Sequence, residues 1–268
     1  TTITLTDNDN PPIILVGPLT DAGAIPTEAW EGPVAEDVGA TSFLISLSTL
    51  SQKAITIDYS VDLENSTAKS GQDYTGLNAT GTISLAAGET STTIDFNILS
   101  DLVDEENQTI ILEMNPLSAV NATASGVGYV GTMTITDDDE PPYVHFNSGN
   151  STTITEGNNG DVNPVNFTLT LSDTSEKAIT IPYVITAVTN PSITGPFWNS
   201  GPVGGGQDYT SSASSITINP LQSLISGTIE ISIVGDVIDE YDESFTISLG
   251  TLVNVLEHPN DDKKKTWT

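Results

Sequence analysis

The sequence TMTITDDDEPP, from Thr132 to Pro142, joins an alternating strand pattern to three consecutive aspartates and two prolines. Threonine alternates with Met133 and Ile135, which is the period-2 pattern of a strand with one buried face. The prolines cannot donate to a β-ladder, and they stiffen the chain that follows. Almost the same phrase, TITLTDNDNPP, occupies Thr2 to Pro12. A motif that recurs after about 130 residues marks the boundary of a repeat.

The composition limits both the partners of the chain and the chemistry that stabilises it. The 268 residues include no cysteine, so disulfides and thiolate metal sites are not available. The formal net charge of −30 argues against binding to nucleic acid or to an anionic membrane, and it makes cations the natural partners. No apolar run reaches the length of about 18 residues that membrane insertion needs. We therefore expect an extracellular or cell-surface protein, microbial in origin, cut from a longer chain.

Nearly every segment predicts a strand between turn residues, and no stretch keeps a helical period over three turns. In the first half the predicted strands are 41–50, 54–61, 81–85, 92–99, 108–114 and 131–136. In the second half they are 165–171, 178–185, 215–218, 227–234 and 244–249. A Greek-key sandwich typically has about seven short strands in roughly 130 residues, and these segments supply most of that number in each repeat. The predicted fold is all-β, with two tandem Greek-key, immunoglobulin-like β-sandwiches standing end to end.

Internal matches define the two repeats. SQKAITIDYSV at 51–61 matches SEKAITIPYVI at 175–185, and GQDYT at 71–75 recurs at 206–210. DLVDEENQ at 101–108 matches DVIDEYDE at 236–243. We predict a first domain at 11–139 and a second at 140–268, joined by a short, stiff linker at Glu140, Pro141 and Pro142. Residues 1–10 are predicted to be a closing strand that belongs to a preceding repeat or to a neighbouring subunit.

Four motifs in this order resemble the Calx-beta domain family. They are an early glutamate (Glu36 and Glu156), the GxDYT turn, the D-x-x-x-E-x-x-E-x-F segment from Asp236 to Phe245, and the closing TITDDD. The family is named for sodium–calcium exchangers and also occurs in long extracellular adhesins. The resemblance covers essentially the whole chain, and it implies sandwiches that bind calcium at one end through these segments.

The resemblance implies a set of calcium ligands in each repeat. In the first they are Glu36, Asp73, Asp101, Glu105, Asp137, Asp138 and Asp139. In the second they are Glu156, Asp208, Asp236, Glu240 and Glu243. Richly liganded members carry a second aspartate beside the one at Asp101 or Asp236, whereas Ser100 and Gly235 stand there in this chain. Gln108 and Ile110 also replace the second glutamate and the phenylalanine of the family. We therefore expect fewer ions per site.

Calcium is also favoured by the chemistry of the residues. Calcium takes about six to eight oxygen ligands, and the loops of a sandwich gather at its poles, where distant acids can converge. Magnesium keeps more of its waters, and two His without cysteine argue against zinc or copper. The alternative is that these acids are ordinary turn residues on a solvated surface. For the triple aspartate at 137–139, the repulsion between adjacent carboxylates favours calcium.

The two ends of the sequence fit one another. TWT at 266–268, followed by TTITLTDNDNPP at 1–12, aligns without a gap to GYVGTMTITDDDEPP at 128–142. We therefore expect the second domain to lack its own last strand and to receive Thr1 to Asp9 from another copy. The copies are either repeats of one long polypeptide or separate subunits joined by strand addition. Asp7 and Asp9 would then join the second calcium site.

Several functions fit these expectations. The first is a structural unit of an extracellular filament, stalk or adhesin, in which calcium fixes the junctions between domains. The second is a calcium-sensing regulatory pair. The third is an adhesin segment that binds a cell-surface or glycan ligand, because Trp30, Phe197 and Trp198 lie in inserted loops where they either contact a sugar or plug their own sandwich. No nucleophile, base or cofactor pattern predicts an enzyme, so no catalytic residues are assigned.

Overall fold

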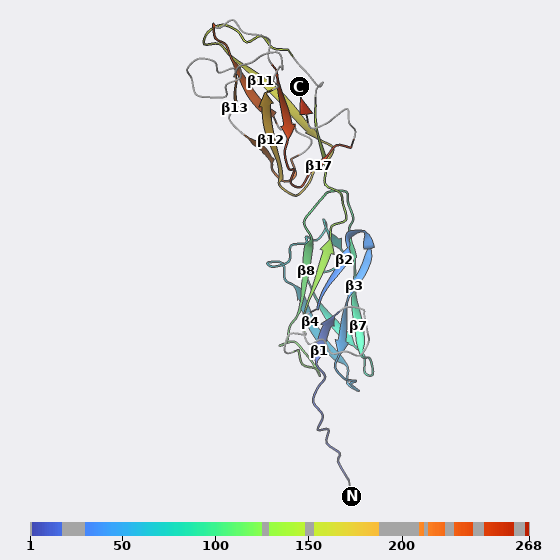
Figure 1. Ribbon diagram of the computed structural model, residues 1–268. Helices are drawn as coiled ribbons and strands as arrows, with labels where there is room; N and C mark the ends of the chain where they lie inside the picture. The colour runs from blue at the N-terminus through green and yellow to red at the C-terminus, as the bar shows by residue number, and fades with distance from the viewer. Residues whose placement is uncertain are drawn as a thin grey trace. The chain divides into compact units, whose positions relative to one another are not determined.

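The computed structural model describes residues 2–17, 30–124, 129–147, 153–187, 209–211, 214–222, 228–237, 244–259 and 266–267 (Figure 1). It divides into two compact units, which we describe separately. The first comprises 1–102 and 106–138, and the second comprises 103–105 and 139–268. The division at 138 lies one residue before the predicted boundary. The segment 103–105 joins the second unit because Asp104 is hydrogen-bonded to Ser175 there.

The first unit is a sandwich of two sheets, with strand orders β1-β3-β7-β5 and β2-β9-β8-β4-β6. Its strands are β1 (Ile14–Gly17), β2 (Trp30–Ala35), β3 (Ala40–Leu47), β4 (Ile55–Val61), β5 (Tyr74–Thr75), β6 (Thr80–Leu85), β7 (Ser91–Ile98), β8 (Gln108–Met114) and β9 (Val130–Thr136). A 3₁₀ helix, η1 (Glu36–Val38), follows β2. The predicted strand patterns of this half are confirmed, and β8 has the predicted bounds.

The second unit has the same architecture, with strand orders β13-β15-β11-β10-β17 and β14-β12-β16-β18. Its strands are β10 (Tyr143–Phe146), β11 (Val162–Leu171), β12 (Ile179–Ala187), β13 (Tyr209–Ser211), β14 (Ser215–Ile218), β15 (Thr228–Val234), β16 (Phe245–Leu249), β17 (Leu256–Glu257) and β18 (Thr266–Trp267). All the long strands predicted for this half are present. The all-β class with tandem sandwiches is therefore confirmed.

Alternating apolar residues build both cores. In β9, Met133 and Ile135 are each 1% exposed, while the threonines that alternate with them are half-buried. Phe43 of β3 stacks on Phe96 of β7 across the first core, with ring centroids 5.5 Å apart. Phe167, which matches Phe43 in the repeat alignment, is buried in the second core. The period-2 pattern therefore fixes which face of each strand is inside.

The closing strand of the first unit lies between two others. β9 pairs antiparallel with β8 from Val130↔Glu113 to Ile135↔Gln108. On its other side it pairs in parallel with β2, from Gly131↔Trp30 to Thr136↔Ala35. The sequence did not predict β2, because its Gly-Pro pair is unusual in a strand. Pro33 is tolerated there because β2 is at the edge of the sheet.

The two chain ends that align with β9 do not form a strand of its length. Residues 2–12 are extended but belong to no strand, and Ile3 and Leu5 are 86% and 93% exposed. The second unit does have a short strand of its own, β18, which pairs with Ile247 and Ser248 of β16. In the first unit Tyr129 lies opposite Met114, so its alignment with Trp267 predicts that Trp267 lies opposite Leu249. Trp267 instead lies opposite Ile247, two residues away. The edge of the second domain thus carries two residues of closing strand.

Candidate metal centre

The pole of the first sandwich at which β2, β7 and β9 end brings several predicted ligands together. β2 and β9 end side by side at the parallel pair Ala35↔Thr136. Glu36 and Asp137, the next residue of each segment, therefore follow at the same end of the sheet. The Thr136 hydroxyl donates to the carbonyl of Val34 at 2.9 Å and secures this end. The turn after η1 then needs Gly39, whose φ of 69° suits glycine.

Glu36 is the most enclosed of these acids. It is 5% exposed, and its Oε1 accepts a hydrogen bond from the backbone N–H of Asp101 at 2.9 Å. The backbone N–H of Ile98 donates to the carbonyl of Gly39 at 2.8 Å, which holds the end of β7 against the same turn. A buried carboxylate normally needs several hydrogen bonds or a cation to compensate its lost hydration.

Glu36, Asp101 and Asp139 form the candidate metal centre. Each offers one carboxylate oxygen, and these oxygens lie within 4.8 Å of one another. Glu36 is buried, Asp139 half-buried and Asp101 exposed. Like charges at this separation repel by about 3 kcal/mol at an effective dielectric constant of about 20, although water screens the exposed member. An oxygen-only donor set with one buried carboxylate suits calcium.

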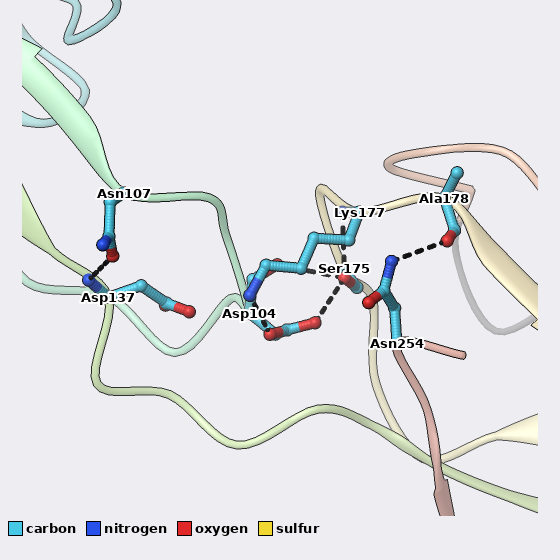
Figure 2. Close-up of polar contacts among 7 residues, drawn as sticks. All are labelled: Asp104, Asn107, Asp137, Ser175, Lys177, Ala178 and Asn254. Atoms are coloured by element: carbon cyan, nitrogen blue, oxygen red, sulfur yellow. Dashed lines mark hydrogen bonds and ion pairs between the residues drawn. The ribbon is translucent and has the colours of Figure 1, made fainter. Parts of the chain in front are cut away.

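The other acids predicted for the first site have separate roles in the structure. Asp73 accepts a hydrogen bond at Oδ2 from the N–H of Lys69 at 2.5 Å, and it lies outside the group of three. Asp137 donates its N–H to Asn107 Oδ1 at 3.1 Å, and its own Oδ1 is buried (Figure 2). Asp138 is exposed, and Glu105 is 7% exposed within the segment that joins the second unit.

The second unit repeats the central contact of the first. Glu156 Oε1 accepts a hydrogen bond from the N–H of Asp236 at 2.8 Å, as Glu36 does from Asp101. The repeat alignment therefore holds at the level of single atoms. Asp208, Glu240 and Glu243 lie outside the described residues. Asp7 and Asp9 are exposed in the N-terminal segment, where Asp7 pairs with Lys53 at 3.2 Å.

The structure explains why one family position is glycine in the second repeat. A Cβ at Gly235 would lie 2.5 Å from the carbonyl oxygen of Asn158 and 2.9 Å from the carbonyl carbon of Gly157. The strand ladder continues here, because Gly235 donates its N–H to the carbonyl of Asp161. The loop after Glu156 thus occupies the space in which a second aspartate would stand.

We expect aspartate at this position to have opposite effects in the two repeats. Ser100→Asp, at an exposed position, should tighten calcium binding by the first domain. Gly235→Asp should destabilise the second domain by about 2 kcal/mol, because backbone atoms must move. Gly235→Ala should destabilise the second domain nearly as much, because the Cβ atom alone causes the clash. Calorimetric calcium titration and urea unfolding measure the two effects. Wild-type stability of both Gly235 variants would contradict the role given to the Asn158 loop.

Comparison with known families decides the classification. The family model for the Calx-beta domain matches residues 20–139 and 199–266, which is more than half of the chain. This chain belongs to the Calx-beta domain family. No curated protein sequence matches it significantly.

Solved Calx-beta structures are among its structural neighbours. A crystal structure of CBD12 from CALX1.2 is 16% identical, with a TM-score of 0.37, and the alignment covers 87% of this chain and 80% of that one. The calcium binding domain CBD12 of CALX1.1 is 17% identical, with a TM-score of 0.38 and coverages of 87% and 81%. The Calx CBD1 domain in its apo form is 16% identical over 48% of this Calx-beta chain and 100% of its own, with a TM-score of 0.38.

One further feature concerns residues that the motifs did not single out. Asp104, Ser175 and Lys177 form a buried polar cluster in the second unit, although none was predicted as a site residue (Figure 2). The S-x-K pattern that precedes the AIT strand in both repeats was the sequence signal that could have identified them.

Within the described part of this Calx-beta chain, no helix has the length and hydropathy needed to span a membrane.

Proposed function

We propose that this Calx-beta pair is a calcium-rigidified structural unit of an extracellular filament, stalk or adhesin. The group formed by Glu36, Asp101 and Asp139 carries the calcium assignment, because it brings three carboxylates, one of them the buried Glu36, within 4.8 Å of one another. Solved relatives that are named calcium binding domains support the same ion. Calcium at this pole would neutralise the acids at the end of β9 and restrict the motion of the chain that follows them.

The structural role, as opposed to regulation, rests on the N-terminal segment. Ile3 and Leu5 alternate with threonine and are 86% and 93% exposed. Their counterparts in the repeat alignment, Met133 and Ile135, are each 1% exposed in β9. Large aliphatic side chains at period 2, exposed on an extended segment, suit a strand that completes another sheet.

The acceptor of this segment is the edge of β16 in another copy. There, β18 pairs with Ile247 and Ser248, whereas β9 covers six residues of β8 in the first unit. Addition of Thr1 to Asp9 after the β18 of another copy would lengthen the closing strand. It would also place Asp7 and Asp9 near that copy's Glu156 and Asp236. The units would then assemble head to tail, either along one polypeptide or between subunits.

We expect the chain to associate head to tail in calcium and to dissociate in chelator. The double variant Ile3→Asp with Leu5→Asp should remain monomeric, because charge on the inward face cannot enter a core. The matched control is Thr2→Asp with Thr4→Asp, which adds the same charge to the opposite face and should still associate. Sedimentation velocity at several concentrations measures both. A monomeric wild type in calcium, or equal association of the two double variants, would refute the strand assignment.

A further inference from the structure

A Ser-x-Lys turn in the second unit binds the carboxylate of Asp104 (Figure 2). Lys177 Nζ donates to Asp104 Oδ1 at 2.6 Å, and the Ser175 hydroxyl donates to Oδ2 at 2.7 Å. The backbone N–H of Glu176 also donates to the Asp104 carbonyl at 2.9 Å. Asp104 is 1% exposed and Ser175 is 4% exposed. The turn therefore recognises both the side chain and the backbone of this aspartate.

The turn is formed by bonds that do not involve Asp104. The N–H of Lys177 donates to Ser175 Oγ at 3.0 Å, which closes the turn locally. The N–H of Leu221 donates to the Ser175 carbonyl at 2.9 Å and anchors the turn to the neighbouring loop. Leu221 has a φ of 58° in that loop.

The first unit contains the same turn. The N–H of Lys53 donates to Ser51 Oγ at 3.1 Å, and the N–H of Gly88 donates to the Ser51 carbonyl at 2.8 Å. Gly88 has a φ of 92°, so the supporting loop is also left-handed at the matching position. Both hydrogen bonds that form the second turn thus have counterparts here. The first unit presents a preformed turn of the kind that binds Asp104 in the second.

The two turns differ in their surroundings. The ion pair of Lys177 has side-chain exposures of 17% for the lysine and 1% for the aspartate. Lys53 instead pairs with Asp7 at 3.2 Å, with side-chain exposures of 63% and 57%. Exposed pairs of this kind contribute little to stability, so Lys53 can exchange Asp7 for another carboxylate. In a chain with only six Lys and Arg residues, a lysine at the same place in both repeats indicates a specific acidic partner.

The sequence identifies that partner. Asp104 is the fourth residue of DLVDE, and Asp239 is the fourth residue of the matching DVIDE. The chain thus has two S-x-K turns and two such acidic segments, and the structure joins one of each. Asp239 lies outside the described residues and enters on sequence alone. In a head-to-tail series, the segment of one copy's second domain precedes the turn of the next copy's first domain.

We propose that the Ser51 to Lys53 turn binds Asp239 of a second copy of this chain, as the Ser175 to Lys177 turn binds Asp104. This inference rests on the proposed head-to-tail assembly and adds a specific contact to it. The charges are complementary, and the binding turn is already formed. The contact would give each junction between copies the same set of bonds that the Ser175 to Lys177 turn forms, whether the copies are covalently joined or separate.

Cysteine cross-linking tests the proximity directly, because the natural chain has no cysteine. The double variant Lys53→Cys with Asp239→Cys should give a ladder of disulfide-linked oligomers under mild oxidation in calcium. The matched control is Lys69→Cys with Asp239→Cys, since Lys69 is also an exposed lysine of the first unit. The control should give only random dimers. Equal ladders in the two variants would overturn the proposed contact.

Charge reversal tests the energetics and separates the two proposals. Lys53→Asp and Asp239→Lys should each weaken association by about tenfold or more, because each places like charges at the junction. An equimolar mixture should recover association, since each unlike contact then joins opposite charges. Lys69→Asp should associate like the wild type. If the wild type associates but both reversals leave it unchanged, the contact is wrong and the assembly stands. If the wild type stays monomeric, both are wrong.

Discussion

Calcium is expected to raise the midpoint of thermal unfolding of the first domain by on the order of 10 °C, and chelator is expected to abolish the gain. One bound ion adds about 2.7 kcal/mol to the free energy of unfolding when the free ion concentration exceeds the dissociation constant about 100-fold. For a domain of this size, that gain raises the midpoint temperature by on the order of 10 °C. The physical cause is the relief of repulsion among Glu36, Asp101 and Asp139, whose oxygens lie within 4.8 Å. Differential scanning calorimetry in calcium and in chelator measures it.

Glu36→Gln is the sharpest variant for this test. The amide keeps an oxygen that can accept the hydrogen bond from Asp101 N–H, but it removes the buried charge. We expect the calcium-dependent gain to disappear, while stability in chelator equals or exceeds that of the wild type. Asp95→Asn is the matched control, because Asp95 is an exposed acid on β7 outside the group. Calcium stabilisation that survives in Glu36→Gln would rule out this centre.

Loss of the Lys177 charge is expected to destabilise the second domain by about 3 kcal/mol, because it leaves the Asp104 carboxylate buried without its cation. The pair has an Nζ to Oδ1 distance of 2.6 Å and a carboxylate that is 1% exposed. Lys177→Met retains most of the aliphatic packing, so the loss reports the charge. Urea unfolding measures the change in the free energy of unfolding.

The first domain supplies the control for this experiment. Lys53→Met removes the matching lysine, whose pair with Asp7 is more than half exposed on both sides, and the single chain should show no measurable loss. A double variant, Lys177→Met with Asp104→Asn, should recover part of the stability, because no buried charge remains. Equal losses at Lys53 and Lys177 would show that burial is not the cause.

The fold could be predicted where strands are half-buried. The alternation in β8 and β14 gave their bounds directly, because polar and apolar faces differ there. β1 escaped prediction because all four of its residues are buried, which removes the alternation. β2 escaped because its Gly-Pro pair is unusual in a strand and its parallel pairing depends on β9, about a hundred residues later. Local pattern therefore finds strands with two different faces, and tertiary pairing decides the rest.

The ligands of the candidate site could be predicted from the sequence, but the contacts around them could not. Glu36, Asp101 and Asp139 were all expected as ligands from the family motifs, and in the structure one carboxylate oxygen of each lies within 4.8 Å of the others. The bond between Asp104 and Lys177 was not, because 73 residues separate them and neither belongs to a ligand motif. Gly235 illustrates a third case. The sequence shows that an acid is missing, but only the position of the Asn158 carbonyl shows why.

The parallel pairing of β2 with β9 has a mechanical consequence. The chain enters the first domain at β1, whose Ile14 lies opposite Leu47 at the far end of β3, and it leaves at Thr136, opposite Ala35. These points lie at opposite poles, so tension on the chain acts along the strands. The six residue pairs that join β2 to β9 would then be loaded in shear, and their evenly spaced hydrogen bonds would share the force instead of opening one after another.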